Sequence, residues 1–339
     1  MKHAVSKRLV ILLSSPLLLL GCGGSSSKEF WIYTSVYKEV YPLFEPGLTE
    51  AFPAVEFKWY QSGSEKIAAK ILAEEKGGGT RADLLMTSDL FFYQELKKLG
   101  RLLTLDGPVF EGVPTELRDP DGAFAVVRIP LMVLAYHREH VTGGDVPTSF
   151  EDLLDPKYEG RLAMPSPLES GSMLTTVLYL YQRFGEAYFE GLRGNDVLSA
   201  GGNGSTLSRI QSGERPVGMV LLENILQAKQ RGLESVEFVI PEEGALPIPS
   251  PLAIFEPTAD GDGSKEELAR RVLDWFLSPA AREVVVQGWM HTAFPDDPPP
   301  NGAPAFGDLR LHPWDLATFE RWGEQRQEVK SSFQRIVLQ

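Results

Sequence analysis

The amino-acid sequence predicts an α/β fold with two lobes, each built on a mostly parallel sheet flanked by helices. Short apolar segments that suit strands alternate with amphipathic helical segments from Glu29 onward. The first segments have the order strand, helix, strand, helix, strand, which builds a parallel sheet with helices on both faces. A second alternating series follows, and a chain of 339 residues has room for two ordinary lobes.

Each expected element of the first series has a local signal. Residues 55–60 alternate apolar and polar side chains, as in a half-buried strand. Ser62 or Ser64 can cap the next helix, and the glycines at 77–79 can end it. The expected elements are strands at 30–33, 55–60 and 82–87 and helices at about 38–51, 64–76 and 90–99.

The second series contains a long apolar helix at about 173–184 and a glycine-rich loop at 201–204, whose following helix Ser205 can cap. The capping box that begins at Ser264 predicts the start of a further helix. The remaining expected elements are strands at 125–129, 131–136, 161–164, 217–222 and 252–255, a capped helix at 149–152, a Pro-rich loop at 295–304 and a helix at about 313–336.

The N-terminal segment predicts export. Basic residues precede the apolar run at 10–20, which contains Pro16 and is shorter than the roughly 18 to 20 residues that span a bilayer. Residues 19–22, Leu-Leu-Gly-Cys, resemble the bacterial lipoprotein processing box, so we expect residues 1–21 to be a signal peptide and Cys22 to carry the lipid. Residues 22–28 then form a tether. The alternative is an ordinary signal peptide in which the cysteine falls there by chance.

Composition excludes several classes of function. The net charge of −13 and the lack of a Lys/Arg cluster beyond the signal argue against a nucleic-acid partner. Cys22 is the single cysteine, so its lipidation leaves no thiol for a disulfide, a metal site or a nucleophile. His137 and His140 follow a strand pattern, which predicts opposite, solvent-exposed sides and no metal site. No nucleophile elbow, P-loop or dinucleotide fingerprint is present, so neither an enzyme nor a cofactor is expected.

Hydroxyl-rich and glycine-rich loops carry the main chemical signal. They come just before expected helices, where backbone N–H groups, the helix dipole and hydroxyl donors can converge on an anion. Taken singly, each could be a plain helix cap. Glu223 follows an apolar strand and could meet an amine or hydroxyl of a ligand, or could be a surface glutamate at a helix start. The candidate ligand-binding residues are Ser35, Tyr37, Ser62, Ser64, Ser88, Ser170, Gly171, Ser172, Asn203 and Glu223.

The order and spacing of several segments resemble the extracellular solute-binding proteins of ABC importers, in particular the ferric-binding-protein-like family. These segments are residues 30–33, 61–64, 82–88, 170–172, 205–218 and 273–279. The resemblance covers nearly the whole mature chain and implies the type II periplasmic-binding-protein fold, with a ligand cleft between the lobes that closes by hinge motion. It places lobe 1 at 29–132 and 246–305 and lobe 2 at 133–245 and 306–339, with crossovers near 129–136 and 245–252.

The resemblance implies a lipid-anchored, monomeric receptor in the cell envelope that faces the periplasm or the exterior and delivers its solute to a membrane permease. Iron-binding members use two adjacent tyrosines after a lobe 2 strand, whereas residues 222–225 here are Leu-Glu-Asn-Ile. The lobe 1 positions, Tyr37 and Ser88, lack the family's histidine or acid. We therefore expect a small anionic solute, such as a phosphonate or phosphorylated metabolite. The alternatives are a ferric-iron receptor and a sensor lipoprotein that imports nothing.

Overall fold

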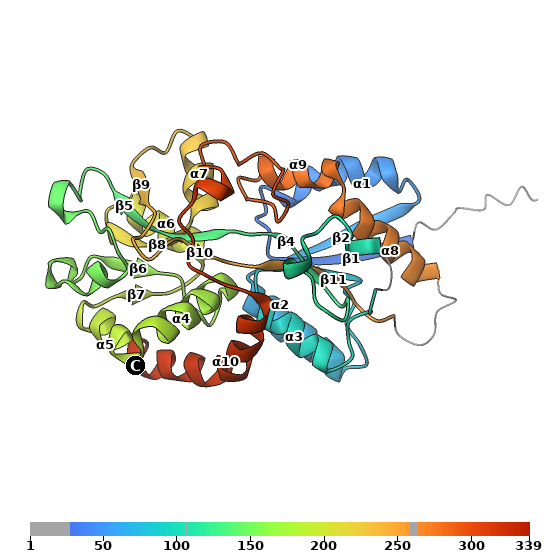
Figure 1. Ribbon diagram of the computed structural model, residues 1–339, viewed down its shortest axis with the longest axis horizontal. Coiled ribbons are helices and arrows are strands. Elements are labelled where there is room, and N and C mark those ends of the chain that lie inside the picture. The colour runs from blue at the N-terminus through green and yellow to red at the C-terminus, as the bar shows by residue number, and fades with distance from the viewer. Residues whose placement is uncertain (1–27, 106–107, 258–263) are drawn as a thin grey trace, which may run out of the picture.

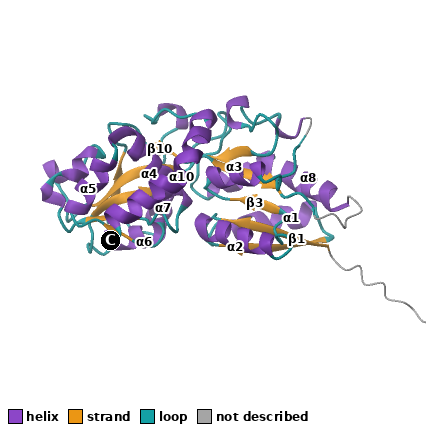
Figure 2. Cartoon of the chain, turned by 90° about the horizontal axis from the view of Figure 1, so that it is seen from below, coloured by secondary structure: helices purple, strands orange, loops and turns teal. Residues whose placement is uncertain are grey.

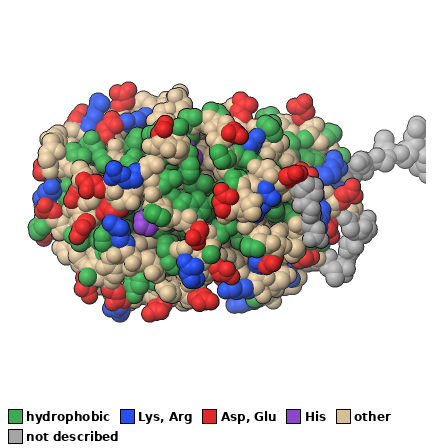
Figure 3. Space-filling view, viewed as in Figure 1, with side chains coloured by type: hydrophobic (Ala, Val, Ile, Leu, Met, Phe, Trp, Pro, Cys, Tyr) green, Lys and Arg blue, Asp and Glu red, His purple; other side chains and the backbone are tan. Residues whose placement is uncertain are grey.

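The computed structural model describes residues 28–105, 108–257 and 264–339, so the expected signal peptide, the lipidation site at Cys22 and all of the tether but Lys28 lie outside the described residues. The chain forms two lobes side by side along the long axis (Figure 1), and charged side chains of both signs are spread over both lobes on this face (Figure 3). Each lobe has a central sheet with helices on both faces (Figure 2). This arrangement confirms the predicted fold class.

Lobe 1 contains the sheet with strand order β2-β1-β3-β11-β4. β1 pairs in parallel with β2 and β3, as the strand and helix alternation predicts, because helical crossovers connect these strands. The strands are β1 (Lys28–Thr34), β2 (Val55–Gln61), β3 (Leu84–Met86), β4 (Ala125–Arg128) and β11 (Ser250–Ile254). The helices are α1 (Glu45–Ala51), α2 (Ser64–Lys76), α3 (Leu90–Lys98), α8 (Ser264–Leu277) and α9 (Pro279–Gln287).

Lobe 2 contains the sheet with strand order β10-β5-β8-β6-β7, and β9 pairs with β5. The strands are β5 (Leu131–His137), β6 (Leu162–Met164), β7 (Leu198–Ser199), β8 (Val217–Leu221), β9 (Val236–Val239) and β10 (Leu246–Pro247). The helices are α4 (Gly171–Phe184), α5 (Glu186–Gly194), α6 (Asn203–Gln211) and α7 (Leu222–Gln230). The first ten residues of α4 are all buried, which explains why its sequence is so apolar.

The chain crosses between the two sheets twice, after β4 and after β10. Because β11 enters lobe 1 from lobe 2, it runs antiparallel to both β3 and β4. In lobe 2, β5 enters from lobe 1 and is antiparallel to β8, β9 and β10. Both sheets are therefore mixed, and the expectation of mostly parallel sheets is corrected at these two crossover strands.

The C-terminal helix α10 (Leu316–Val337) contacts both lobes. It packs against α3 of lobe 1 and against α4 and α5 of lobe 2, and Figure 1 shows it along the lower edge of the molecule. Phe319 and Phe333 are fully buried on it and lie in one apolar cluster with residues of α3 and α4. Within the described part of the chain no helix is both long and apolar enough to span a bilayer.

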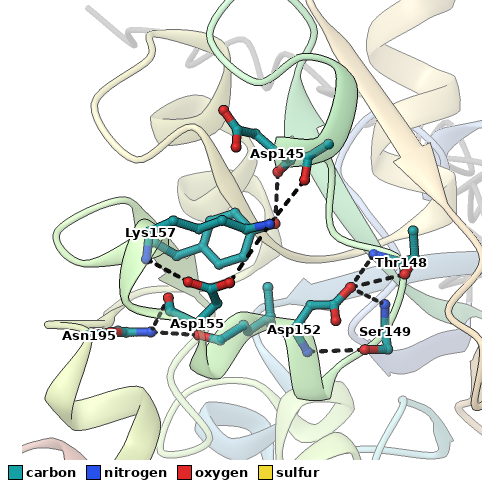
Figure 4. Close-up of polar contacts among 10 residues, drawn as sticks. Asp145, Thr148, Ser149, Asp152, Asp155, Lys157 and Asn195 are labelled. Carbon is teal, nitrogen blue, oxygen red and sulfur yellow. Dashed lines mark hydrogen bonds and ion pairs between the residues drawn. The ribbon is translucent and has the colours of Figure 1, made fainter.

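Some helix starts differ from those expected. Gly63 and Gly202 occupy the N-cap positions of α2 and α6, so Ser62, Ser64 and Ser205 do not cap them. The helix expected at 149–152 is a single 3-10 turn, Glu151–Leu154. Its capping box is nevertheless present, because Asp152 accepts bonds from Thr148 and Ser149 while the Ser149 hydroxyl accepts from the Asp152 N–H (Figure 4).

The two histidines expected on opposite sides of a strand lie together. β5 ends at His137, and the turn that follows brings the His140 ring to 4.3 Å from the His137 ring, edge to face. His137 is buried, which lowers its pKa. His140 is exposed, as expected, whereas His137 is not. The expectation that the two rings lie on opposite sides was wrong, because the strand ends before His140.

Candidate ligand-binding cleft

A cavity of about 180 Å³ lies between the lobes and is lined by residues from both. Hydroxyl groups dominate its wall. Its lining includes eight of the ten predicted site residues, namely Ser35, Tyr37, Ser62, Ser64, Ser88, Ser170, Ser172 and Asn203. The topology brings them together because loops from the carboxyl ends of β1, β2, β3 and β6 meet at one edge of each sheet.

On the lobe 1 side, three serines converge at the ends of three neighbouring strands. The backbone N–H of Ser88, after β3, donates to the Ser35 Oγ at 3.1 Å and to the Ser64 Oγ at 3.3 Å. Ser64 is also the first residue of α2, so the positive end of this helix dipole faces the cavity. These contacts hold the hydroxyls in fixed positions at the cavity wall.

On the lobe 2 side, α4 and α6 both begin at the cavity. The Ser170 Oγ caps α4 by accepting from the Met173 N–H and lies 2.9 Å from the Ser172 Oγ. Asn203 donates to the Ser172 Oγ at 3.1 Å, while its own Oδ1 is buried and has no hydrogen-bond partner among the described residues. Together the two helix starts and the polar side chains form a donor-rich surface suited to an anion.

Glu223 lies at the start of α7, directly after β8, and it is 3 % exposed. Burial raises the pKa of its carboxyl to about 7. Its Oε1 is buried and finds no hydrogen-bond partner in the described chain. The reading as a surface glutamate was wrong, because the first seven residues of α7 are all buried.

Arg128 is a site residue that was not predicted from the sequence. It lies beneath the cavity at the end of β4. Its guanidinium is 2 % exposed and donates to the Ser88 Oγ at 3.1 Å and to the Met290 sulfur at 3.4 Å. Its Nε is buried and has no hydrogen-bond partner within the described residues. Burial lowers the pKa of Arg128 and the negative charge of Glu223 raises it. One signal was available: a lone arginine in the apolar run 125–129.

Two polar contacts join the lobes across the cleft. The Tyr37 Oη of lobe 1 donates to the Asn224 Oδ1 of lobe 2 at 2.8 Å. Lys66 of lobe 1 pairs with Glu169 of lobe 2 at 2.7 Å between Nζ and Oε2. The lobes are therefore in contact on two sides of the cavity, as expected for a closed receptor.

Gly171, a predicted ligand contact, lies where the lobes touch and is not among the residues that line the cavity. A Cβ at this position would stand 2.7 Å from the Asp89 Cβ and 2.9 Å from the Ser88 carbonyl oxygen. Real Cβ atoms do not approach this closely, so the close approach of the lobes at this point requires glycine.

The residues present offer little for a metal ion. No group of three or more His, Cys, Asp or Glu side chains lies close enough together to hold one within residues 28–105, 108–257 and 264–339. Tyr37 and Glu223 could each supply an oxygen ligand, but burial and the charge of Glu223 raise the pKa of Tyr37 well above its ordinary value. Tyr37 thus favours its protonated form, which binds metals poorly.

Comparison with known proteins identifies the family of this chain. The profile of a family described as bacterial extracellular solute-binding protein matches residues 80–313. Iron uptake protein A2 of Synechocystis is 26 % identical over 215 residues, which cover 59 % of this chain and 60 % of that protein. The alignment thus spans less than two thirds of that relative.

Solved structures show the same fold. The periplasmic binding protein AfuA of Actinobacillus pleuropneumoniae, with fructose-6-phosphate bound, superposes with a TM-score of 0.79 at 22 % identity, over 92 % of this chain and 99 % of that one. Iron-bound HitA of Pseudomonas aeruginosa gives a TM-score of 0.77 at 18 % identity, over 90 % and 99 %.

The chain therefore belongs to the bacterial extracellular solute-binding proteins. Proteins of this family bind a small solute outside the cytoplasmic membrane and deliver it to a permease. The similar proteins are binding proteins and not enzymes.

Proposed function

We propose that this chain is a lipid-anchored, monomeric receptor of an ABC importer that captures a small anionic solute by closure of its two lobes. The ten residues predicted from the sequence, from Ser35 to Glu223, together with Arg128, form the binding site. The same proposal includes a lipid anchor at Cys22 and lobe boundaries at 132/133, 245/246 and 305/306.

One observation carries the choice of an anion: the Arg128 guanidinium, buried beneath the hydroxyl-lined cavity, forms no direct ion pair among the described residues and feels the charge of only one carboxyl, that of the buried Glu223, whose pKa is about 7. A buried cation without a paired anion is costly, so a bound anion would satisfy it. The starts of α2, α4 and α6 add backbone N–H donors around the same cavity. AfuA carries fructose-6-phosphate in its structure, which favours a phosphorylated metabolite as the solute here.

Thermal unfolding with candidate solutes tests the proposal. A ligand that binds only the folded state stabilises it by RT ln(1 + [L]/Kd), about 2.7 kcal/mol at a hundredfold excess over Kd. We expect phosphonates, sugar phosphates or phosphoglycerate to raise Tm, and sulfate to do so weakly. A rise with ferric citrate only would refute an organic anion.

A ferric receptor is the second candidate, because the Synechocystis relative is an iron uptake protein and HitA is iron-bound. Tyr37 and Glu223 would then supply oxygen ligands together with a bound anion. Iron loading would produce a visible phenolate-to-iron charge-transfer band if this candidate is right, and Tyr37→Phe would abolish it. Protein that stays colourless after loading excludes it.

A further inference from the structure

A second cavity continues the cleft beyond the first. Its volume is about 460 Å³, and its wall includes Tyr37, Gln61 and Gly204, which also line the first cavity. The hydrogen bond from Tyr37 to Asn224 lies at this shared boundary. The cleft therefore has two compartments: an inner one, lined by serines, and an outer one beyond Tyr37.

The outer compartment has its own chemistry. Helix α7 lines it with Asn224, Gln227 and Ala228, a spacing that places these residues on one face of the helix, and Arg231 follows at its C-cap. Gln211, at the end of α6, adds another amide to the wall. The wall also contains Lys38, Glu39 and Arg231, but the Glu39 carboxylate pairs with both cations. The amides are therefore the polar groups left to bind a ligand, and they suit hydroxyl oxygens.

Two of these amides lack partners. The Nε2 atoms of Gln211 and Gln227 are buried, and neither has a hydrogen-bond partner among the residues that the structure describes. Gln227 is 8 % exposed. Buried amide donors are normally satisfied, so these two point to acceptor groups that a ligand or its water would bring into this compartment.

The volumes of the two compartments also favour a ligand that occupies both. Pockets for small molecules commonly measure about 300 to 1,000 Å³. The inner compartment, at about 180 Å³, is below this range, whereas the outer one, at about 460 Å³, is within it. A phosphate group and a few carbons would fill the inner compartment and leave the outer one to a longer molecule.

We infer that the solute is a phosphate or phosphonate with an extended hydroxyl-bearing tail, whose anionic end lies in the inner compartment and whose tail passes Tyr37 to bind Gln211 and Gln227 in the outer one. The inference rests on the proposed function, since the inner compartment must bind the anion. The amide donors of the outer compartment then set the preference for tail length and tail hydroxyls.

Calorimetric titration with two acyclic probes tests this. Glycerol 3-phosphate is short, and sorbitol 6-phosphate adds three hydroxyl-bearing carbons to the same phosphomonoester. We expect the wild-type protein to bind sorbitol 6-phosphate at least tenfold more tightly. The Gln227→Met variant keeps the side-chain shape but loses the amide, so it should bind sorbitol 6-phosphate about fivefold more weakly and glycerol 3-phosphate unchanged.

The Gln287→Met variant is the matched control, because Gln287 is exposed and lies on α9, away from both cavities. It should bind both probes as the wild type does. Gln211→Met provides a second variant should Gln227→Met unfold. Equal affinities for the two probes, or equal losses for both in the variants, would overturn the two-compartment site and leave the anion receptor intact. Failure of both probes and of inorganic phosphate to bind the wild type would overturn both.

Discussion

Gly171 at the start of α4 meets Ser64 at the start of α2 so closely that a Cβ on Gly171 would stand 2.8 Å from the Ser64 Cβ. One residue belongs to lobe 2 and the other to lobe 1. The contact thus joins the two helix starts at the edge of the cleft. The two lobes can approach this closely only because residue 171 has no side chain.

The Gly171→Ala variant should bind ligand at least tenfold more weakly, because the methyl group keeps the lobes apart while each lobe still folds. Tm without ligand should change little. Small-angle scattering of the variant with a Tm-raising ligand should show a larger radius of gyration than the wild type. Gly194→Ala is the control, since nothing lies within 4 Å of a Cβ placed there. Unchanged affinity in Gly171→Ala would show that closure does not require this contact.

Arg326 on α10 connects the C-terminal helix to lobe 1. Its Nη2 lies 2.7 Å from the Glu65 Oε1 and 2.8 Å from the Asp89 Oδ2, and Lys330 also pairs with Glu65. Burial raises the pKa of Asp89 to about 7 against the pull of Arg326. Burial also opposes the ionisation of Glu65, but the charges of Arg326 and Lys330 hold its pKa below the ordinary value.

The Arg326→Met variant should therefore lose about 3 kcal/mol of unfolding free energy, because the buried Asp89 loses its ion-pair partner and Glu65 keeps only Lys330. Urea unfolding at pH 8 measures the loss, and lowering the pH to 5.5 should reduce it as Asp89 takes up a proton. Arg321→Met, on the exposed face of the same helix, should change stability by less than about 0.5 kcal/mol. Equal losses in the two variants would contradict the role of the buried pairs.

Local patterns predicted most strands and helices and most of the residues that line the cavity between the lobes. Eight of the ten predicted site residues line one cavity because hydroxyl loops follow strands, and strand ends meet at one sheet edge. The directions of β5 and β11 were not predictable from local pattern, since they depend on where the chain crosses between lobes. The helix caps at Gly63 and Gly202 were missed because neighbouring serines are the more common capping residues.

Contacts between side chains that are far apart in the sequence were not predictable from local pattern either. Nothing near Arg128 in sequence indicates that Ser88, forty residues away, receives its hydrogen bond. The contact between Tyr37 and Asn224 joins residues separated by 187 positions. Such pairs follow from tertiary packing, which a single sequence does not reveal.

Glu223 should make stability depend on pH. Its pKa in the folded state is about 7 because of burial, whereas an exposed glutamate titrates near 4.5. The folded state therefore holds a proton that the unfolded chain has released between these values, and the unfolding free energy should fall as the pH rises from about 4.5 to 7. The full loss for this one group is at most about 3 kcal/mol.

The Glu223→Gln variant should flatten this part of the pH profile, measured as urea midpoints from pH 4.5 to 8. It should also bind anionic ligands more tightly above pH 7, because a negative charge near the anion is removed. Asp89 titrates in the same range, so the slope that remains in the variant reports the second carboxyl. An unaltered profile would place the proton uptake on groups other than Glu223.

Substitutions of the two serines at the start of α4 should affect folding stability and anion affinity differently. Ser170 caps the helix, so Ser170→Ala should lower the unfolding free energy by about 1 kcal/mol. It should also weaken anion binding if the Ser170 hydroxyl contacts the ligand. Ser172 accepts from Asn203 and lines the cavity without capping the helix, so Ser172→Ala should mainly weaken anion binding, by about 1 kcal/mol. Ser212→Ala, on the exposed end of α6, is the control for both measurements. Full affinity in both variants at unchanged Tm would place the anion away from the start of α4.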